Sequence, residues 1–514
     1  MSGGLLVVEA VLVPDLVSGA MTLASAISAM LIYRLISWIF IAAIGWVVFL
    51  FMFRTEKDGD PDAALQDEDA PKSRIHRSSG PIPKRRTNPN HRIGGMRSIH
   101  ATAAVFGAVA LIAGCSPATE SPSTPTSTPS SSSAAPASRT SPQPAVATPL
   151  LASAVAAPIP VPATDGKYHL AYELVLTDAL SQDVTMTSLA VVAGDKTLLT
   201  LSGDKLVYRT RVLGSPTTPS TKLGSGQSAI VWLDVALERP ADGTPPTIPT
   251  NLAHTIGVSL SQPNPPILLP TMTETVAPVT VQTRKPVVIA PPLDGPNWLD
   301  ADSCCDMGAH RMAMNPLNGQ LWASERFAID YVQLDDQGRL FAGDKSRLET
   351  YPFFGADIHA VADGPVVLVV DGQPEQVPGG LPTGLTLDQY SGNRIIQDIG
   401  GGNYAFYAHL KTGSVKVKVG DQLKPGQVIA SLGNSGNTDA PHLHFHVMST
   451  PDPLASNGLP FVFSSFKLDG RLASMHAVDP VMAGQPAPMQ PGFAARDETD
   501  VSPLTLDVMS YPTP

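Results

Sequence analysis

The sequence predicts a mainly β protein built from several parts joined by linkers. At 514 residues the chain is too long for one ordinary domain. Its 50 prolines are close to a tenth of the residues, against a usual share of about 5%, and proline breaks regular structure. Many of them must therefore lie in linkers and loops. In the second half of the chain, short runs with apolar residues at every second position alternate with turn residues, as in antiparallel strands.

Composition excludes several classes of protein. Hydrophobic residues make up 43% of the chain and charged residues 15%, which argues against a wholly disordered protein. The net charge of −11 gives nucleic acid no general reason to bind, because phosphate neutralisation needs clustered Lys and Arg. Three cysteines are too few for a disulfide scaffold or a four-cysteine zinc module.

Residues 1–55 are expected to hold transmembrane segments. The run 30–53 is apolar except for Arg34 and Ser37, and it is long enough to cross a hydrocarbon core of about 30 Å. Residues 5–21 form a weaker candidate for a partner helix. The basic segment 56–95 is expected to stay in the cytoplasm as a solvated linker, since positive charges are retained on that side.

Residues 96–115 read as a signal-like segment. An apolar run too short for a comfortable transmembrane helix ends in LIAGC, as in the core of a signal peptide. This ending resembles a bacterial lipobox, which implies lipidation at Cys115 and a cell-membrane protein with its C-terminal domains extracytoplasmic. The first fifty or so residues resemble the last helices of the flippase-like membrane domain found with lysylphosphatidylglycerol synthases. Either residues 1–95 are a genuine fusion, or they come from a start-site artefact.

The next two parts are a linker and a β domain. Residues 116–165 are mostly Ser, Thr, Pro and Ala, a composition that cannot bury a core, so we expect a disordered tether. At about 3.1 Å per residue its span approaches 150 Å. Residues 166–290 are predicted to form a β-sandwich-like domain with a positioning or binding role. We interpret His169 and His254 within it as surface or packing residues. Alternation is clearest in 168–176, 231–237 and 256–260.

The strongest chemical signal lies in the stretch 403–447. Its short strands are separated by glycine turns, which indicates an antiparallel β-unit. His442, His444 and His446 follow one another at every second position, so a strand places them on one face, about 6.6 Å apart. In such a row one histidine can bind a metal while its neighbour acts on a substrate.

Two further features lie upstream. Asp330 sits among apolar residues in SERFAIDYVQLD. Taken alone it is either a ligand or a charge at a strand end, and the row of histidines favours the ligand interpretation. Cys304 and Cys305 are adjacent, so we expect a vicinal disulfide or two free thiols and not a pair of zinc ligands.

These motifs resemble the zinc metallopeptidases of the M23 type, also called LytM or lysostaphin-like. The resemblance runs from about Ala328 to Val447, and its specific parts are YAHL, VKVGDQLKPGQVI and PHLHFHV. It implies an antiparallel β peptidase domain, which we place at 295–485, followed by a C-terminal tail at 486–514. The resemblance further implies that Asp330 and His444 bind Zn²⁺ and that His409 and His442 are the catalytic pair.

One departure from the family concerns the first zinc ligand. The family has His four residues before the Asp, whereas this chain has Arg326, and a cation cannot ligate zinc. His310 is the best substitute, because residues 310–322 could form a strand and turn that lead back alongside Arg326. We interpret His446 as support for a ligand, and His359 as a structural residue.

The expected function is therefore that of a membrane-tethered zinc endopeptidase acting on the peptide part of peptidoglycan. Three protein ligands leave one position for water, whose pKa zinc lowers towards about 7. One of His409 and His442 takes the proton and the other assists the leaving amine, and spacing does not tell which is the base. The alternative is a catalytically inactive protein that binds the cell wall or regulates a partner hydrolase, which Arg326 favours. Two candidate membrane helices are too few for a transporter.

Overall fold

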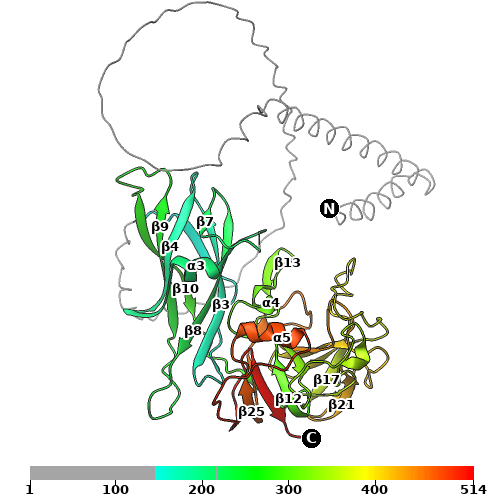
Figure 1. The fold of residues 1–514 in the computed structure, drawn as a ribbon. Coiled ribbons are helices and arrows are strands. Elements are labelled where there is room, and N and C mark those ends of the chain that lie inside the picture. Colours follow the sequence, from blue (N-terminus) through cyan, green and yellow to red (C-terminus); the bar gives the residue numbers. More distant parts are fainter. Residues whose placement is uncertain (1–144, 216, 514) are drawn as a thin grey trace, which may run out of the picture. The chain divides into compact units, whose positions relative to one another are not determined.

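The computed structural model describes residues 145–215 and 217–513, which belong to one compact unit, Ser133–Pro514 (Figure 1). The expected transmembrane segments, basic linker and signal-like segment with Cys115 lie outside the described residues, as does most of the tether. No helix among the described residues has the length and apolarity needed to cross a membrane. The described chain is built mainly of antiparallel strands, as the sequence predicted.

The middle part is a sandwich of two five-stranded sheets. The first sheet has the order β1-β3-β8-β6 with β2 beside β3, and the second has the order β10-β9-β4-β5 with β7 beside β4. Inward-facing residues such as Leu174, Val231 and Ile256 are fully buried between them, so the predicted sandwich is present. The first sheet consists of β1 (Leu150–Ala154), β2 (Val161–Pro162), β3 (Tyr168–Asp178), β6 (Thr210–Val212) and β8 (Ser228–Leu237), and the second of β4 (Val184–Ala193), β5 (Lys196–Ser202), β7 (Lys222–Leu223), β9 (Asn251–Leu260) and β10 (Thr271–Thr280), with α3 (Gly203–Tyr208) between β5 and β6.

The sandwich begins earlier than the sequence suggested. Strand β1 lies inside the segment 116–165 that was expected to be a linker, and it pairs antiparallel with β3 over its whole length. The side chain of Leu150 is fully buried, and its amide donates to the carboxylate of Glu274 at 3.2 Å. The expectation was therefore wrong at the C-terminal end of the linker, because these contacts fix residues whose composition alone indicates disorder.

Strand β3 is buried on both faces. Leu170, Tyr172 and Leu174 face the interior of the sandwich, whereas Ala171 belongs to the core of the C-terminal domain. Glu173, on the same face as Ala171, has no exposed surface. Alternation had indicated a half-buried strand, but the C-terminal domain covers its second face.

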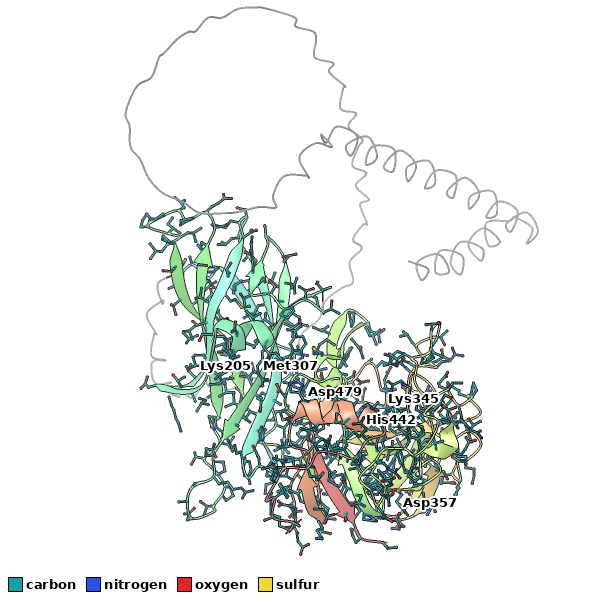
Figure 2. All side chains as sticks on the ribbon, viewed as in Figure 1. Lys205, Met307, Lys345, Asp357, His442 and Asp479 are labelled. Carbon is teal, nitrogen blue, oxygen red and sulfur yellow. A yellow bond between two sulfur atoms is a disulfide. The ribbon has the colours of Figure 1, made fainter. Side chains whose placement is uncertain are left out.

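The C-terminal domain is organised around one eleven-stranded sheet with the order β20-β17-β18-β19-β22-β15-β12-β27-β25-β26 and with β23 beside β22. Side chains fill its interior (Figure 2), and residues such as Tyr331, Tyr407 and Phe445 are fully buried there. The strands of this sheet are β12 (Gly295–Asp300), β15 (Ile329–Gln333), β17 (Gly364–Val370), β18 (Asn393–Asp398), β19 (Tyr404–Leu410), β20 (Gln422–Leu423), β22 (Leu443–Met448), β23 (Gly458–Leu459), β25 (Phe466–Arg471), β26 (Arg496–Glu498) and β27 (Asp507–Tyr511).

Short elements complete this domain. The hairpin of β13 and β14 connects α4 to the segment before β15, and it is the turn expected after His310. The remaining elements are β11 (Val287–Ile289), α4 (Ala309–Met312), β13 (Met314–Leu317), β14 (Gln320–Ala323), η2 (Leu348–Thr350), β16 (Asp357–His359), β21 (Val428–Ser431), β24 (Phe461–Phe463), η3 (Met475–Ala477) and α5 (Val478–Met482).

The expected tail, 486–514, is part of the sheet and not an appendage. Strand β27 lies between β12 and β25 and is hydrogen-bonded to both, and β26 extends the sheet beyond β25. Val508 and Met509 are buried. The interpretation as a tail was wrong because two short strands give too few positions for alternation to be recognised.

Candidate metal centre and catalytic cleft

Strand β22 sorts its residues onto two faces. Leu443, Phe445 and Val447 point into the hydrophobic core, so the histidines between them share the opposite face. The ring centroids of His444 and His446 lie 5.0 Å apart. The row of histidines predicted from their spacing is therefore present.

Asp330 meets His444 because their strands are paired. In the antiparallel register of β15 and β22, Asp330 is the direct partner of His444, and directly opposite side chains on one face lie within contact distance. The Nδ1 atom of His444 is 3.0 Å from the Oδ1 atom of Asp330. The same carboxylate oxygen lies 3.4 Å from Nε2 of His442.

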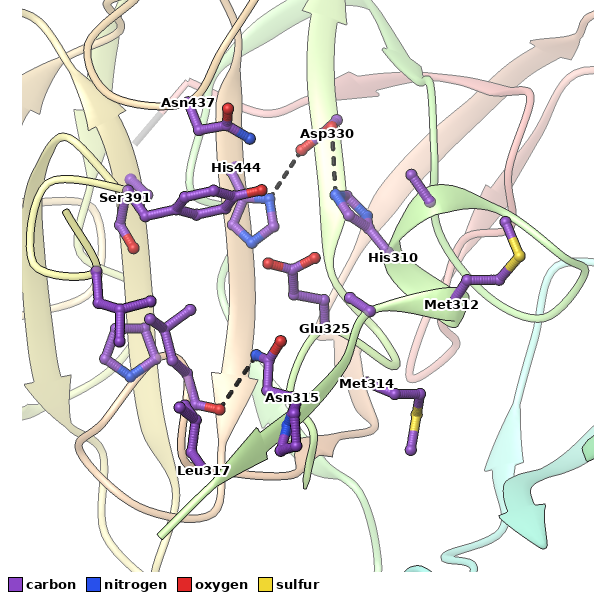
Figure 3. Close-up of a pocket in the computed structure, with 18 of the residues that line it drawn as sticks. His310, Met312, Met314, Asn315, Leu317, Glu325, Asp330, Ser391, Asn437 and His444 are labelled. Atoms are coloured by element: carbon purple, nitrogen blue, oxygen red, sulfur yellow. Dashed lines mark hydrogen bonds and ion pairs between the residues drawn. The ribbon is translucent and has the colours of Figure 1, made fainter. Parts of the chain in front are cut away.

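His310 reaches the same carboxylate from α4, a helix of four residues. Its Nε2 atom is 3.2 Å from Oδ2 of Asp330, whereas its Nδ1 atom is 3.1 Å from the carbonyl oxygens of both Asp302 and Ala328. Nδ1–H thus donates to the backbone, and Nε2 is directed at the Asp330 carboxylate (Figure 3). The loop before α4 approaches closely enough that a side chain at Gly308 would collide with the Asp302 carboxylate.

One ligand atom from each of His310, Asp330 and His444 lies within 4.8 Å of the other two. Two imidazole nitrogens and one carboxylate form a donor set typical of catalytic zinc sites. The other nitrogen of His444, Nε2, lies 2.9 Å from Nδ1 of His446. His310 and His444 therefore each have one ring nitrogen held by a hydrogen bond and the other directed towards Asp330. These residues fit a zinc ion.

The charges in this cluster are strongly coupled. Burial opposes ionisation of Asp330, but the neighbouring imidazoles of His310 and His442 hold its pKa well below the ordinary value. Burial likewise opposes protonation of His310, yet the Asp330 carboxylate raises the pKa of this histidine well above its ordinary value. The pKa of His442 is raised by the same carboxylate against the effect of burial. Asp330 is thus an anion in a position that attracts cations.

His409 and His442 face each other beside this cluster, with ring centroids 4.6 Å apart. Nδ1 of His409 lies 2.7 Å from the carbonyl oxygen of Ser435, and Nδ1 of His442 lies 2.8 Å from that of Ala440. Both Nδ1–H groups donate to the backbone. Nε2 of His409 is thereby left as a proton acceptor, whereas Nε2 of His442 lies 3.4 Å from the Asp330 carboxylate. Burial and the neighbouring imidazoles of His442 and His444 lower the pKa of His409 well below its ordinary value.

The backbone around His409 is irregular. The register between β18 and β19 shifts at this point, and His409 has a φ of 59°, a left-handed conformation that is uncommon outside glycine. A bulge of this kind redirects a side chain. The Ser435 loop that holds His409 packs so closely that a side chain at Gly436 would collide with the backbone of Gly392.

The five residues of the two clusters line a cleft of about 940 Å³ (Figure 3). The C-terminal domain supplies most of its lining, and β6 and β8 of the sandwich add Val212, Ile230 and Trp232. Several polar residues of this cleft could not be predicted, because they belong to no recognisable motif and, except for Asn315 in β13, lie in loops and turns. These are Asn315, Glu325, Tyr390, Ser391, Asn437 and Thr438.

Arg326 does not point into the metal centre. Its guanidinium meets Glu173 of β3, with Nε 3.0 Å from Oε1 and Nη2 2.5 Å from Oε2. Arg311 pairs with the same carboxylate. Burial would raise the pKa of Glu173, but Arg326 and Arg311 lower it, so the carboxylate is ionised. The arginine at the position of the family's first ligand thus pairs with Glu173, a carboxylate that it shares with Arg311.

His169, His254, His359 and the adjacent cysteines have structural surroundings. His169 lies between Asp165 and Asp234, and His254 pairs with the Tyr172 hydroxyl at 2.7 Å. Nδ1 of His359 donates to the carbonyl of Gly426. Cys304 and Cys305 are joined in a vicinal disulfide. The Cys305 sulfur lies near His169 and Asp234, but as part of a disulfide it is not the thiolate that a metal requires.

Comparison with known proteins identifies the C-terminal domain. Residues 350–456 match the model of peptidase family M23. The chain contains an M23 peptidase domain. The matched range includes His409, His442 and His444 but begins after His310 and Asp330. The structure is what brings these two residues to the rest of the site.

Curated relatives are similar over the same part of the chain. The glycyl-glycine endopeptidase ALE-1 of Staphylococcus capitis is 32% identical over 114 residues, which are 22% of this chain and 27% of that protein. Lysostaphin of Staphylococcus simulans is 39% identical over 77 residues, 14% of this chain and 15% of its own length. The chain thus matches less than a third of the length of either relative.

Solved structures include similar chains. The catalytic domain of lysostaphin from S. simulans aligns with 30% of this chain and 80% of its own, at 23% identity and a TM-score of 0.17. The catalytic domain of the prophage-encoded M23 protein EnpA from Enterococcus faecalis aligns with 34% of this chain and 93% of its own, at 19% identity and a TM-score of 0.19.

Proposed function

We propose that the chain is a zinc metalloendopeptidase that hydrolyses peptide bonds of bacterial peptidoglycan. The observation that carries this proposal is the meeting of His310, Asp330 and His444, with ligand atoms within 4.8 Å of one another, beside a second pair of histidines in one cleft. Similarity to an endopeptidase that its name describes as acting on glycyl-glycine bonds supports peptides of the cell wall as the substrate. Zinc-dependent peptidase chemistry is typical of the family that the domain matches.

In this proposal Nε2 of His310, the Asp330 carboxylate and Nδ1 of His444 hold the zinc ion. When bound, zinc supplies a Lewis acid that activates water and polarises a carbonyl group. His446 orients His444 through the contact between Nε2 and Nδ1, as outer hydrogen-bond partners of metal-binding histidines do.

His409 and His442 move protons. In hydrolysis the C–N bond of the peptide breaks, hydroxide adds to the carbonyl carbon and a proton goes to the leaving amine. The Nε2 atom of one histidine accepts the proton of water, and the other histidine donates a proton to the amine. Ser435 and Ala440 hold both rings through their Nδ1 atoms, so the two side chains are oriented before substrate binds.

We further propose that residues 1–144 place the peptidase outside the cytoplasm, through a membrane anchor that includes lipidation at Cys115 and a long tether. The sequence patterns described above support this part of the proposal. A tether suits an enzyme whose substrate, the cell wall, lies away from the membrane surface.

Zinc content tests the proposal directly. Elemental analysis of the purified full chain, after incubation with zinc and removal of the excess, is expected to give one zinc per chain. His310→Ala and His444→Ala should each lose it, and His476→Ala is a matched control because His476 is exposed on η3. Cleavage of purified peptidoglycan is then followed by counting new amino groups. A parent chain that binds zinc but releases no amines would favour the inactive, wall-binding alternative, and a parent without zinc would exclude the metalloenzyme.

A further inference from the structure

The Glu173 triad, which consists of Glu173, Arg311 and Arg326, is a buried ion cluster that joins the sandwich to the C-terminal domain. Glu173 is 0% exposed, Arg311 1% and Arg326 4%. A carboxylate and two guanidinium groups removed from water in this way lose several kcal/mol of hydration each, so the geometry must be well satisfied for the cluster to persist. Breaking such a cluster from one side leaves an uncompensated buried charge.

The triad holds the short helix that carries His310. Arg311 follows His310 directly in α4, which has four residues. Gly308, at its N-terminus, offers no side-chain cap, and the Asp302 carboxylate accepts from the His310 amide at 3.2 Å. One helical turn is not stable by itself, so its position depends on contacts with other elements. Besides Glu173, Arg311 donates to the carbonyl oxygens of Leu233 at 3.0 Å and Tyr172 at 3.4 Å. Its three acceptors all lie on β3 and β8 of the sandwich.

The triad also holds the segment that leads to Asp330. Arg326 lies four residues before Asp330, and Gly458 packs against its backbone so closely that a Cβ atom there would lie 2.8 Å from the Arg326 amide nitrogen. One carboxylate of the sandwich therefore binds both segments that approach the metal centre. His310 belongs to the first and Asp330 to the second.

We propose that Glu173 is a positioning residue for the metal centre, acting through Arg311 to hold His310 towards Asp330, so that the sandwich domain completes the zinc site of the peptidase domain. This inference rests on the proposed function. It gives the sandwich a specific role. It also gives a role to Arg326, which stands where the family has its first ligand: this arginine belongs to the cluster that holds His310, the substitute ligand.

The test compares two buried carboxylates in the full chain. Glu173→Gln removes the charge that holds α4. Asp507→Asn is its matched control, because Asp507 is also 0% exposed and pairs with Arg471 at 2.6 Å and with Thr164. Zinc affinity is measured by competition with a chelator, and circular dichroism identifies the variants that fold.

Zinc affinity is expected to fall about 10- to 100-fold in Glu173→Gln, the loss typical of removing an outer-shell partner, and to be unchanged in Asp507→Asn. In the cobalt-substituted protein, the visible absorption of Glu173→Gln should differ from that of the parent chain, and that of Asp507→Asn should not. Arg311→Lys keeps the positive charge, and it replaces Glu173→Gln as the test variant if Glu173→Gln does not fold. It should weaken zinc binding more than Arg471→Lys does, because a lysine cannot reproduce the fork of donors.

Each result decides a separate claim. Parental affinity in a folded Glu173→Gln variant, or equal losses in both carboxylate variants, would overturn the positioning role while leaving the metalloenzyme intact. If Glu173→Gln does not fold and Arg311→Lys does, the comparison is between Arg311→Lys and Arg471→Lys. Equal zinc affinities of these two variants would likewise overturn the positioning role. A parent chain that binds no zinc overturns the proposed function and this inference together.

Discussion

Nε2 of His310 lies 3.2 Å from Oδ2 of Asp330, although the chain passes through α4 and the β13–β14 hairpin between the two residues. The hairpin turns the chain back, so that His310, well upstream of β15, reaches Asp330, which is the carboxylate of that strand. The candidate metal centre of the C-terminal domain is thereby built from three separate segments. Its integrity depends on how those segments are held.

The catalytic pair and the ligands should be separable by mutation. His409→Ala and His442→Ala each remove an imidazole of the catalytic pair but leave the ligand atoms of His310, Asp330 and His444 in the chain, so zinc content should stay at the parental level. Peptidoglycan cleavage should fall by about 10²- to 10⁴-fold, the usual contribution of general acid–base catalysis. Elemental analysis and the amine-release assay on the same preparations check this. Loss of zinc in either variant would show that the histidine is a ligand.

Replacing His446 should weaken zinc binding without abolishing it. Its Nδ1 atom accepts a hydrogen bond from Nε2 of His444, and His446 is 1% exposed. His446→Leu should lower zinc affinity by about 10- to 100-fold, whereas His446→Asn keeps an acceptor at a similar distance and should lose less. Chelator competition on the two variants measures the difference. Equal affinities would mean that packing alone, and not the hydrogen bond, fixes His444.

Gly436→Ala should destabilise the domain more than an alanine at another left-handed glycine. Gly436 has a φ of 86° and close contacts with the Gly392 backbone, whereas Gly413 has a φ of 69° and open space around it. Left-handed strain of about 1–2 kcal/mol is common to both substitutions, and the collision adds to it only at Gly436. Urea unfolding of zinc-free protein gives the free energies. Similar losses would mean that the loop can yield at little cost.

Stability should fall between about pH 6.5 and pH 9 because of His169. Asp165 and Asp234 overcome the effect of burial and raise the pKa of His169 from 6.5 to about 9. Below pH 6.5 the histidine is protonated in both states and its ion pairs stabilise the fold fully. As the pH rises to 9 the unfolded chain releases its proton first, so the stabilisation, of the order of 3 kcal/mol at about 1.4 kcal/mol per pKa unit, is lost.

The measurement for His169 is urea unfolding across this pH range with a chelator present, which removes any contribution from metal. His169→Gln cannot change its charge and should flatten the profile. If the stability of His169→Gln declined with pH as steeply as that of the parent, the pH dependence would belong to other groups.

The strands that carry the catalytic histidines could be predicted from the sequence, because alternation is a local property. A row of histidines at every second position lies on one face wherever a strand forms, and Leu443 and Phe445 between them show which face is buried. The partnership of Asp330 with His444 then followed from the family resemblance. His310 could be named as a substitute ligand because the hairpin after it is short.

The role of Glu173 could not be predicted in the same way. In the sequence it is one charged residue in an apolar strand, and its partners Arg311 and Arg326 are more than a hundred positions away. Nothing local shows that a second domain covers β3. The same holds for β1, β26 and β27, whose short segments become strands through their pairing with distant ones.

The place of β27 in the large sheet has a consequence for unfolding. This strand, formed by residues 507–511, joins β12 to β25 in the interior of the sheet. If β27 detached, the path of hydrogen-bonded strands would be interrupted between β12 on one side and β25 with β26 on the other. Proteolytic cleavage between β26 and β27 would therefore weaken the middle of the sheet and not only its edge.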